Sequence, residues 1–228
     1  GETFYNLTIN NTHAAPDDTN DVDSSALVTI TNTLTVTDGQ FQPTTASSFK
    51  DVSIGAAGIL KPDSAASITA SGNWTNSGTF THNNGTITLN GAGGTTQLLD
   101  GTTTFYNLTK TTTTANVLSL DDLDTFTINN ALTLTGASLQ RLTLQSDDPT
   151  NTVDFDLVAG GTQSLDYLTV VRIDSATGLT LIPSNTAGGD CTSTVNWTCG
   201  GGGTYIWDGS ASSVWSAAAN WDVGRVPD

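Results

Sequence analysis

The sequence predicts an all-β protein, and a parallel β-solenoid is the architecture that fits it best. Composition is the first reason. Of the 228 residues 43 are Thr, whereas the straight-chain helix formers are scarce, with one Glu and no Met. Thr and Val favour strands, and Asp, Asn and Gly favour turns. The other reasons are an alternation of apolar and polar residues with a period of two, and an internal duplication.

The duplication consists of two pairs of segments that lie about a hundred residues apart. Residues 3–8 (Thr-Phe-Tyr-Asn-Leu-Thr) recur as residues 104–109, and residues 28–37 resemble residues 126–135. The offsets are 101 and 98 residues, so the two matches are collinear. A repeated all-strand unit is typical of proteins that build length or surface.

Short strand-like runs alternate with turn clusters along most of the chain. In chain order we expect strands at residues 26–37, 49–54, 66–70, 78–82, 85–90, 103–109, 125–135, 141–145, 152–158, 164–173 and 177–182. Leu34 and Val36 alternate with Thr, and Leu132 and Leu134 do the same. This is the pattern of a strand with one buried and one solvated face.

Two architectures fit these strands. In a parallel β-solenoid, each coil contributes short strands to stacked sheets, and apolar anchors recur once per coil. Such anchors are spaced by 14 to 19 residues at Val36, Ile54, Ile68, Ile87 and Phe105. The alternative is a tandem pair of antiparallel β-sandwiches, which the hundred-residue period and the hairpin signal Asn84-Gly85 would support. The anchors favour the solenoid.

The chain divides into four parts by composition and sequence pattern. We expect a first repeat unit at residues 1–100 and a second at 101–199, closed by a cysteine loop. Residues 200–203 are four consecutive glycines and read as a linker. Residues 204–228 hold three of the five Trp and read as the start of a further module or an inter-subunit connector. We therefore expect the chain to be a piece of a longer polypeptide.

Residues 72–87 carry a recognisable repeat, Gly-Asn-Trp-Thr-Asn-Ser-Gly-Thr-Phe-Thr-His-Asn-Asn-Gly-Thr-Ile. Together with the Thr-Phe-Tyr-Asn-Leu-Thr segments and the tryptophans of 207–221, it resembles repeats of bacterial surface proteins of the filamentous-haemagglutinin and autotransporter-passenger types. The resemblance implies a β-solenoid stalk, an adhesin or a surface fibre, and it implies no catalytic residue. Residues 153–182 depart from the repeat pattern.

Charge and hydropathy exclude some partners. The net charge of −16 disfavours nucleic acid and anionic membrane surfaces. No apolar run approaches the length of a membrane span, so we expect no membrane insertion. Low Lys content, the absence of Met and a close cysteine pair suit an extracellular or cell-surface protein.

The sequence gives little support for a catalytic site. His13 and His82 lie among polar residues, and no Gly-x-Ser-x-Gly elbow is present. Asp154 and Asp156 share a strand face and could form the carboxylate pair of a polysaccharide-cleaving β-helix. Clusters are expected by chance among 21 Asp, however, so we expect no enzyme and no catalytic residue.

Calcium is the small ligand that the sequence favours. Five oxygen-bearing side chains fall within seven residues, namely Asp17, Asp18, Asn20, Asp21 and Asp23. Hard cations take such ligands, although the Gly and Glu of an EF-hand are missing. We expect any bound metal to be calcium at these residues.

Cys191 and Cys199 enclose a short loop without nearby His, so zinc is disfavoured and a disulfide is expected. The function that we expect is structural, as a segment of an extracellular fibre that assembles head-to-tail with itself. The first alternative is an adhesin or carbohydrate-binding stalk that recognises cell-surface glycans. Trp74, Tyr106 and Trp207 could supply aromatic faces for it, although core packing explains these residues equally well. The second alternative is a polysaccharide-active enzyme.

Overall fold

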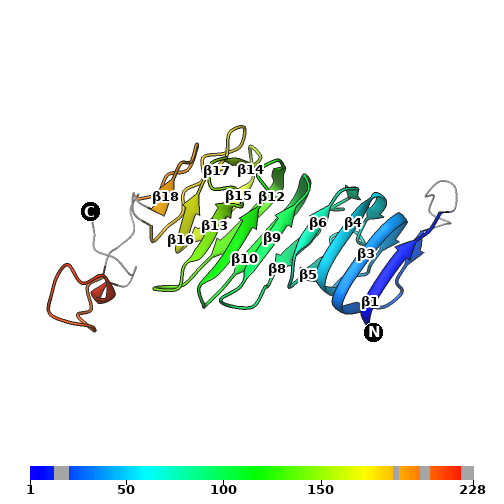
Figure 1. The fold of residues 1–228 in the computed structure, drawn as a ribbon, viewed down its shortest axis with the longest axis horizontal. Helices are drawn as coiled ribbons and strands as arrows, with labels where there is room; N and C mark the ends of the chain where they lie inside the picture. The colour runs from blue at the N-terminus through cyan, green and yellow to red at the C-terminus, as the bar shows by residue number, and fades with distance from the viewer. Residues whose placement is uncertain (13–20, 187–189, 201–205, 222–228) are drawn as a thin grey trace.

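The chain forms a parallel β-solenoid of about eight turns, as seen in a computed structural model that describes residues 1–12, 21–186, 190–200 and 206–221. Figure 1 shows the coils stacked along the long axis, with β1 at one end and β18 towards the other. Every pair of named strands in the described residues is parallel. The fold class that the sequence predicts is confirmed, and the tandem antiparallel sandwich is wrong.

The strands are β1 (Glu2–Asn10), β2 (Val22–Asp23), β3 (Val28–Gln42), β4 (Ser48–Leu60), β5 (Ser67–Ala70), β6 (Trp74–Asn76), β7 (Thr79–Phe80), β8 (Thr86–Leu89), β9 (Thr96–Asp100), β10 (Thr103–Thr111), β11 (Asn116–Leu120), β12 (Thr125–Thr135), β13 (Leu142–Ser146), β14 (Val153–Leu157), β15 (Thr162–Asp166), β16 (Leu168–Val171), β17 (Ile173–Asp174) and β18 (Cys191–Thr192). A 3₁₀ turn, η2, spans Ala218–Asn220. No helix of the described residues has the length and apolar character that a membrane span requires.

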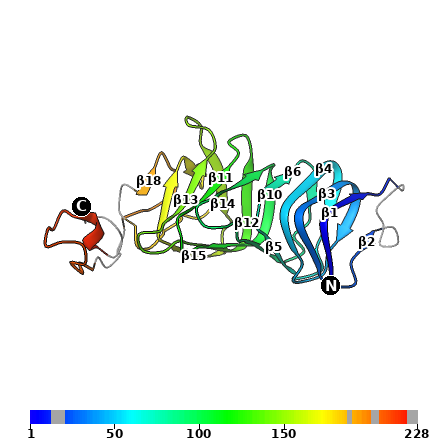
Figure 2. The ribbon, with the colours of Figure 1, turned by 60° about the horizontal axis from the view of Figure 1, so that its bottom comes forward.

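Each coil has three sides, which follow from the strand pairings. Side A contains β5, β8 and β15, side B contains β6, β9, β11, β13, β16 and β18, and side C contains β7, β14 and β17. The long strands β1, β3, β4, β10 and β12 bend through a corner and contribute to more than one side. Figure 2 shows this stacking from a second direction.

Coil length is not constant. A coil takes 18 residues where Thr33 lies beside Asp51, and 31 residues where Ala131 lies beside Thr162. The extra residues form turns and loops at the corners, because the paired strands themselves keep their register. Val36 lies directly beside Ile54, so this pair of predicted anchors is one coil apart, as expected.

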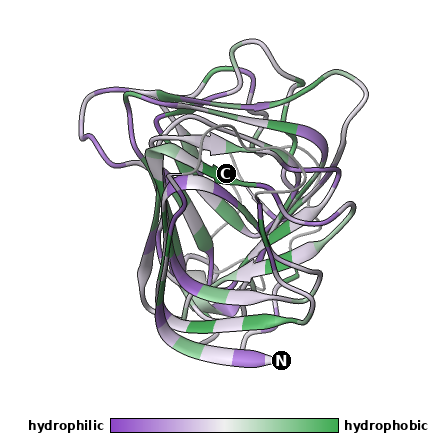
Figure 3. Ribbon diagram, turned by 90° about the vertical axis from the view of Figure 1, so that its right-hand side faces the viewer, coloured by the Kyte–Doolittle hydropathy of each residue, from purple (hydrophilic) through white to green (hydrophobic). Residues whose placement is uncertain are grey.

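The core is a column of apolar side chains inside the coils. Leu34, Val36 and Leu132 are buried, whereas the Thr residues between them stay partly exposed. Figure 3 looks along the stack and shows hydrophobic and hydrophilic residues alternating along the strands. This alternation confirms the period of two, and all five predicted anchors are buried.

The two copies of Thr-Phe-Tyr-Asn-Leu-Thr occupy equivalent places in two strand pairs. β1 lies beside β3, with Leu7 opposite Leu34, and β10 lies beside β12, with Leu108 opposite Leu132. In both pairs the register shifts at the Tyr of the motif, Tyr5 or Tyr106 in turn. The sequence echo therefore encodes a bent strand pair with a bulge at its corner.

An asparagine pair fixes that corner in both copies. Asn32 donates from Nδ2 to Asn6 Oδ1 over 2.9 Å in the first copy. Asn130 donates from Nδ2 to Asn107 Oδ1 over 2.7 Å in the second. These side-chain bonds run from one coil to the next, so they hold the corner in register along the stack.

The hairpin reading of Asn84-Gly85 is wrong. Asn83 and Asn84 have φ angles of 47° and 59°, and the Gly85 N–H bonds back to the His82 carbonyl. The turn leads into β8, which pairs in parallel with β5 and β10. A Cβ on Gly85 would lie 2.4 Å from the Ala66 carbonyl oxygen, so close packing of coils requires glycine here.

Two of the expected strands differ from the structure. Residues 177–182 are not a strand, and only Leu181 there makes an isolated bridge, to Trp197. Residues 164–173 form three strands, because Tyr167 and Arg172 have φ angles of 49° and 56° and turn the chain at corners. Positive φ at non-glycine residues is what alternation patterns cannot predict.

Candidate functional site

The open edge of β1, at the first coil, is the most distinctive apolar surface of the solenoid. β1 pairs with β3 alone among the described strands, whereas its duplicate β10 pairs with both β8 and β12. Residues of the same type are also buried to different extents in the two strands. Phe4 is 37% exposed, whereas the equivalent Phe105 is fully buried.

A groove lies along this open edge. Its volume is about 340 Å³, and Phe4, Leu7 and Phe41 are among the apolar residues that line it. The polar and charged part of the lining includes Glu2 and Asp23. The groove is thus an apolar trough with acidic margins, open to a further strand or to another apolar ligand.

Carboxylates converge at the corner between sides B and C of the central coils. Asp100, Asp121 and Asp124 place oxygens within 4.8 Å of one another, and Asp121 belongs to a second such group with Asp122 and Asp147. Desolvation by burial, followed by repulsion from Asp121, Asp124 and Asp147, raises the pKa of Asp100. The clusters Asp121-Asp122-Asp124 and Asp147-Asp148 are visible in the sequence, but their convergence with Asp100 depends on the register between coils.

Part of the acidic corner has a structural role. Asp124 accepts hydrogen bonds from the backbone N–H groups of Gly101 at 2.6 Å and Thr102 at 2.9 Å. These bonds tie one coil to the next. The remaining carboxylate oxygens are of the kind that a hard cation would bind.

The residues of the predicted calcium loop are only partly within the described chain. Asp17, Asp18 and Asn20 lie outside the described residues. Asp21 accepts a hydrogen bond from Gln40, and Asp23 ends β2. Calcium at these residues stays a prediction.

The carboxylate pair Asp154 and Asp156 does not form two equivalent groups. Asp156 is buried and accepts bonds from the Gly178 N–H at 3.1 Å and from Thr177, so it holds a turn of the next coil. Burial raises the pKa of Asp154, and the nearby charges of Asp156 and Asp174 raise it further. Only Asp154 therefore resembles a proton donor, and its neighbour is occupied structurally.

The two histidines fall in different parts of the chain. His13 lies outside the described residues. His82 is at the turn after β7, where its Nδ1 accepts the Asn84 N–H at 3.1 Å, and its ring lies 5.5 Å from that of Tyr106. Burial lowers the pKa of His82.

The aromatic residues proposed for sugar stacking behave differently from one another. Trp74 is fully buried and packs edge-on against Phe80, with ring centroids 4.9 Å apart, so its role in glycan binding is wrong. Trp207 is 41% exposed and Trp215 is 62% exposed. The exposed tryptophans thus lie in the C-terminal described segment, outside the named strands.

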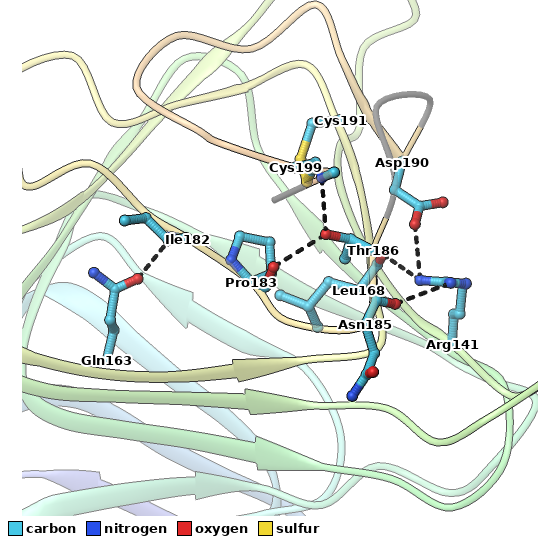
Figure 4. Close-up of a disulfide and its surroundings, with 11 residues drawn as sticks. Arg141, Gln163, Leu168, Ile182, Pro183, Asn185, Thr186, Asp190, Cys191 and Cys199 are labelled. Carbon is cyan, nitrogen blue, oxygen red and sulfur yellow. Dashed lines mark hydrogen bonds and ion pairs between the residues drawn. A yellow bond between two sulfur atoms is a disulfide. The ribbon is translucent and has the colours of Figure 1, made fainter. Parts of the chain in front are cut away.

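A disulfide closes the far end of the stack, as Figure 4 shows. Cys191 and Cys199 are bonded, with Cα atoms 5.7 Å apart. Beside the disulfide, Arg141 Nη1 forms a 2.9 Å ion pair with Asp190 and donates to the Leu168 carbonyl, also at 2.9 Å. The expected disulfide is present, and a buried ion pair that the sequence did not indicate lies next to it.

A buried lysine is a further feature that was not expected from the sequence. Lys110 is 1% exposed, and its Nζ donates to Gln97 Oε1 at 2.8 Å. Gln97 in turn donates to the Ala70 carbonyl at 3.0 Å. The signal was available, because Lys110 stands where the first copy of the repeat has the apolar Ile9.

Comparisons with known proteins add no relative to this description. No family model matches the chain, and the comparisons with curated proteins and with solved structures likewise find no match. The class of protein is therefore defined by its fold, a β-solenoid repeat protein.

Proposed function

We propose that this chain is a structural segment of an extracellular surface fibre, similar in role to the stalks of filamentous-haemagglutinin-type and autotransporter-passenger proteins. The observation that carries the proposal is the open edge of β1. Residues 107–109 of the motif pair on both edges in β10, whereas the motif in β1 pairs on one edge among the described strands, so β1 offers a surface that fits a further coil. Head-to-tail contacts of this kind propagate along one axis.

Other features agree with this role. Parallel coils give a rigid rod whose length grows with the number of coils, because each coil contacts mainly its neighbours. A disulfide at the end of the stack suits an oxidising, non-cytoplasmic environment. The charge of −16 keeps such a rod soluble.

Light scattering after size-exclusion chromatography, together with electron microscopy, tests the proposal on residues 1–228. We expect concentration-dependent association and rod-shaped particles. Leu7→Asp places a charge in the groove of β1 and should reduce association, whereas the matched control Leu123→Asp, at a loop residue that is 87% exposed, should not. A monodisperse monomer at all concentrations would contradict the proposal.

Glycan binding is the second candidate, because Trp207 and Trp215 leave much of their surface exposed. A glycan array with the wild type and Trp215→Ala tests it. Binding that is lost in the variant supports an adhesive module. Turnover of a polysaccharide would favour the enzyme reading instead.

Calcium belongs to the same proposal as a stabilising ion of the Asp17–Asp23 loop. A ligand that binds only the native state raises the melting temperature. The melting temperature in excess calcium should therefore exceed that in excess EDTA, and equal values would remove calcium from the proposal.

A further inference from the structure

Side A carries an unbroken row of hydroxyl side chains across eight neighbouring strand segments. The register between paired strands joins them one after another in the order Thr3, Thr29, Ser48, Thr69, Thr88, Thr109, Thr133 and Ser164. We call this row the hydroxyl ladder. The strands that carry it are stacked along the long axis of the molecule in Figure 1, so the row runs along that axis.

The hydroxyls in the middle of the ladder are not used within the protein. Thr69, Thr88, Thr109 and Thr133 make no side-chain hydrogen bond to any described residue, and Ser48 only approaches Thr29 at 3.5 Å. Loop threonines behave differently. Thr95, for example, donates to the Ala92 carbonyl at 2.5 Å. These hydroxyls are therefore hydrogen-bond donors and acceptors that only water or an external ligand can satisfy.

Two further rows flank the ladder at positions two residues away along the strands. One row contains Ser67, Thr86, Asn107, Ala131 and Thr162, and the other contains Thr111, Thr135 and Asp166. Small polar side chains dominate both rows, no aromatic residue belongs to them, and Asp166 is their charged member. Lys50, two residues after Ser48, is an exposed cation, whereas Lys110, next to Thr109, is buried.

The result is a two-dimensional lattice of small polar groups. Neighbouring strands of a sheet lie about 4.8 Å apart, and residues two apart along a strand lie about 6.6 Å apart. Threonine is β-branched, so its hydroxyl and methyl groups keep a fixed χ1 orientation relative to the sheet. Hydroxyls one strand separation apart lie at or beyond the limit of a direct hydrogen bond, as the 3.5 Å between Ser48 and Thr29 shows, so we expect water to bridge most neighbouring pairs.

A surface with translational repeat in two directions best complements a ligand that also repeats in two directions. We propose that the hydroxyl ladder of side A binds ice, by ordering a layer of water whose spacing is close to the oxygen repeats on the prism faces of hexagonal ice. A crystalline polysaccharide also repeats, but flat sugar rings favour aromatic platforms, and none is present in the three rows. The proposal does not rest on the fibre function.

Ice affinity and thermal hysteresis of residues 1–228 test the proposal. The wild type should enter slowly growing ice, and it should depress the freezing point below the melting point. Thr88→Lys and Thr109→Lys each place a long, hydrated cation in the ladder and should remove most of both activities. The matched control is Thr143→Lys, which changes an equally half-buried, outward-facing threonine on β13 of side B.

Melting temperatures establish that each variant is folded before its activity is compared. Exclusion of the wild type from ice without thermal hysteresis would overturn the proposal. Equal loss of activity in Thr143→Lys would also overturn it, because the effect would then not belong to side A. Binding to crystalline cellulose or chitin but not to ice would replace it with a polysaccharide surface.

Discussion

Individual residues explain how the repeat departs from its own pattern. The second copy of the duplicated motif places Lys110 at an inward position that Ile9 fills in the first copy. Burial lowers the pKa of Lys110 to about 8, and Gln97 is its hydrogen-bond partner. A buried amine in a column of apolar side chains destabilises the folded state in its charged form.

Lys110→Ile should therefore stabilise the protein at pH 7, by about 1–3 kcal/mol. The folded pKa lies below the unfolded value of about 10.4, so the unfolded state binds more protons between the two. The penalty of the wild-type Lys is complete below pH 8 and disappears as the pH rises towards 10.4. Denaturant unfolding at pH 7 and pH 10 measures the gain, which should shrink at the higher pH.

The comparison has a surface control. Lys50→Ile, at an exposed residue, should change stability by no more than ~0.5 kcal/mol at either pH. In the Lys110→Ile variant, Gln97 Oε1 still accepts a hydrogen bond from the Gly91 N–H, at 3.4 Å. A loss of stability in Lys110→Ile at pH 7 would show that the amine contributes more through its bond than it costs through burial.

Asp100 gives a corresponding prediction for an acidic residue. Its pKa is raised by burial and by neighbouring carboxylates, so its ionised form is disfavoured in the folded state. Asp100→Asn should stabilise the protein at pH 7 by about 0.5 kcal/mol, and the gain should vanish as the pH falls below the unfolded pKa of about 3.9. Melting temperatures across this pH range measure the effect.

Asp148 is the matched residue for this experiment. Hydrogen bonds from the Thr150 side chain and from the backbone of Thr150 and Asn151 lower its pKa. Asp148→Asn should therefore destabilise the protein at pH 7, and the loss should fade as the pH falls through the folded pKa. The same sign for Asp100→Asn and Asp148→Asn would contradict the assignment of these two environments.

At the scale of elements, the end of the stack depends on contacts that cross several coils. Arg141 precedes β13 and reaches the Leu168 carbonyl one coil on, and Nη2 donates to the Asn185 carbonyl at 3.1 Å beyond it. Its ion pair with Asp190 is largely buried, with side-chain exposures of 16% and 8%. The last coil is thus fastened both by this pair and by the disulfide.

Arg141→Ala should destabilise the last coil by about 3–5 kcal/mol, because it leaves the buried Asp190 without its cation. Chemical denaturation monitored at Trp197, a largely buried residue of this coil, measures the change. Arg172→Ala, which loses one backbone contact from Nε to the Asp148 carbonyl, is the control and should cost less. Recovery in an Arg141→Ala, Asp190→Ala double variant would identify the unpaired carboxylate as the cause.

At the scale of the whole molecule, the period-two pattern predicted strands with one buried face, as at Leu34 and Leu132, and the spacing of the apolar anchors favoured the solenoid over tandem sandwiches. It could not predict the turn at Asn84-Gly85, since the same dipeptide suits a hairpin and a coil corner. It left open whether Trp74 is exposed or packed in the core, because alternation does not distinguish the two faces of a three-residue strand. The ladder required the register between coils, which depends on loop lengths.

The duplicated motif provides an internal measurement of how much stacking stabilises a coil. Residues 3–8 and 104–109 have the same sequence, so their intrinsic amide exchange rates are matched, whereas their surroundings differ in one neighbouring strand. In a solenoid, stability is a sum of contacts between adjacent coils, and an edge strand opens more easily than a central one. We expect hydrogen exchange at least about tenfold faster in β1 than in β10, which corresponds to about 1.4 kcal/mol. Mass spectrometry of peptides that cover the two segments measures the ratio in a single sample.

Equal protection would mean that the edge of β1 is already covered in solution, either by a second copy of the chain or by a segment of the same chain. Dilution distinguishes these two covers, because a second copy dissociates on dilution and an intramolecular cover does not.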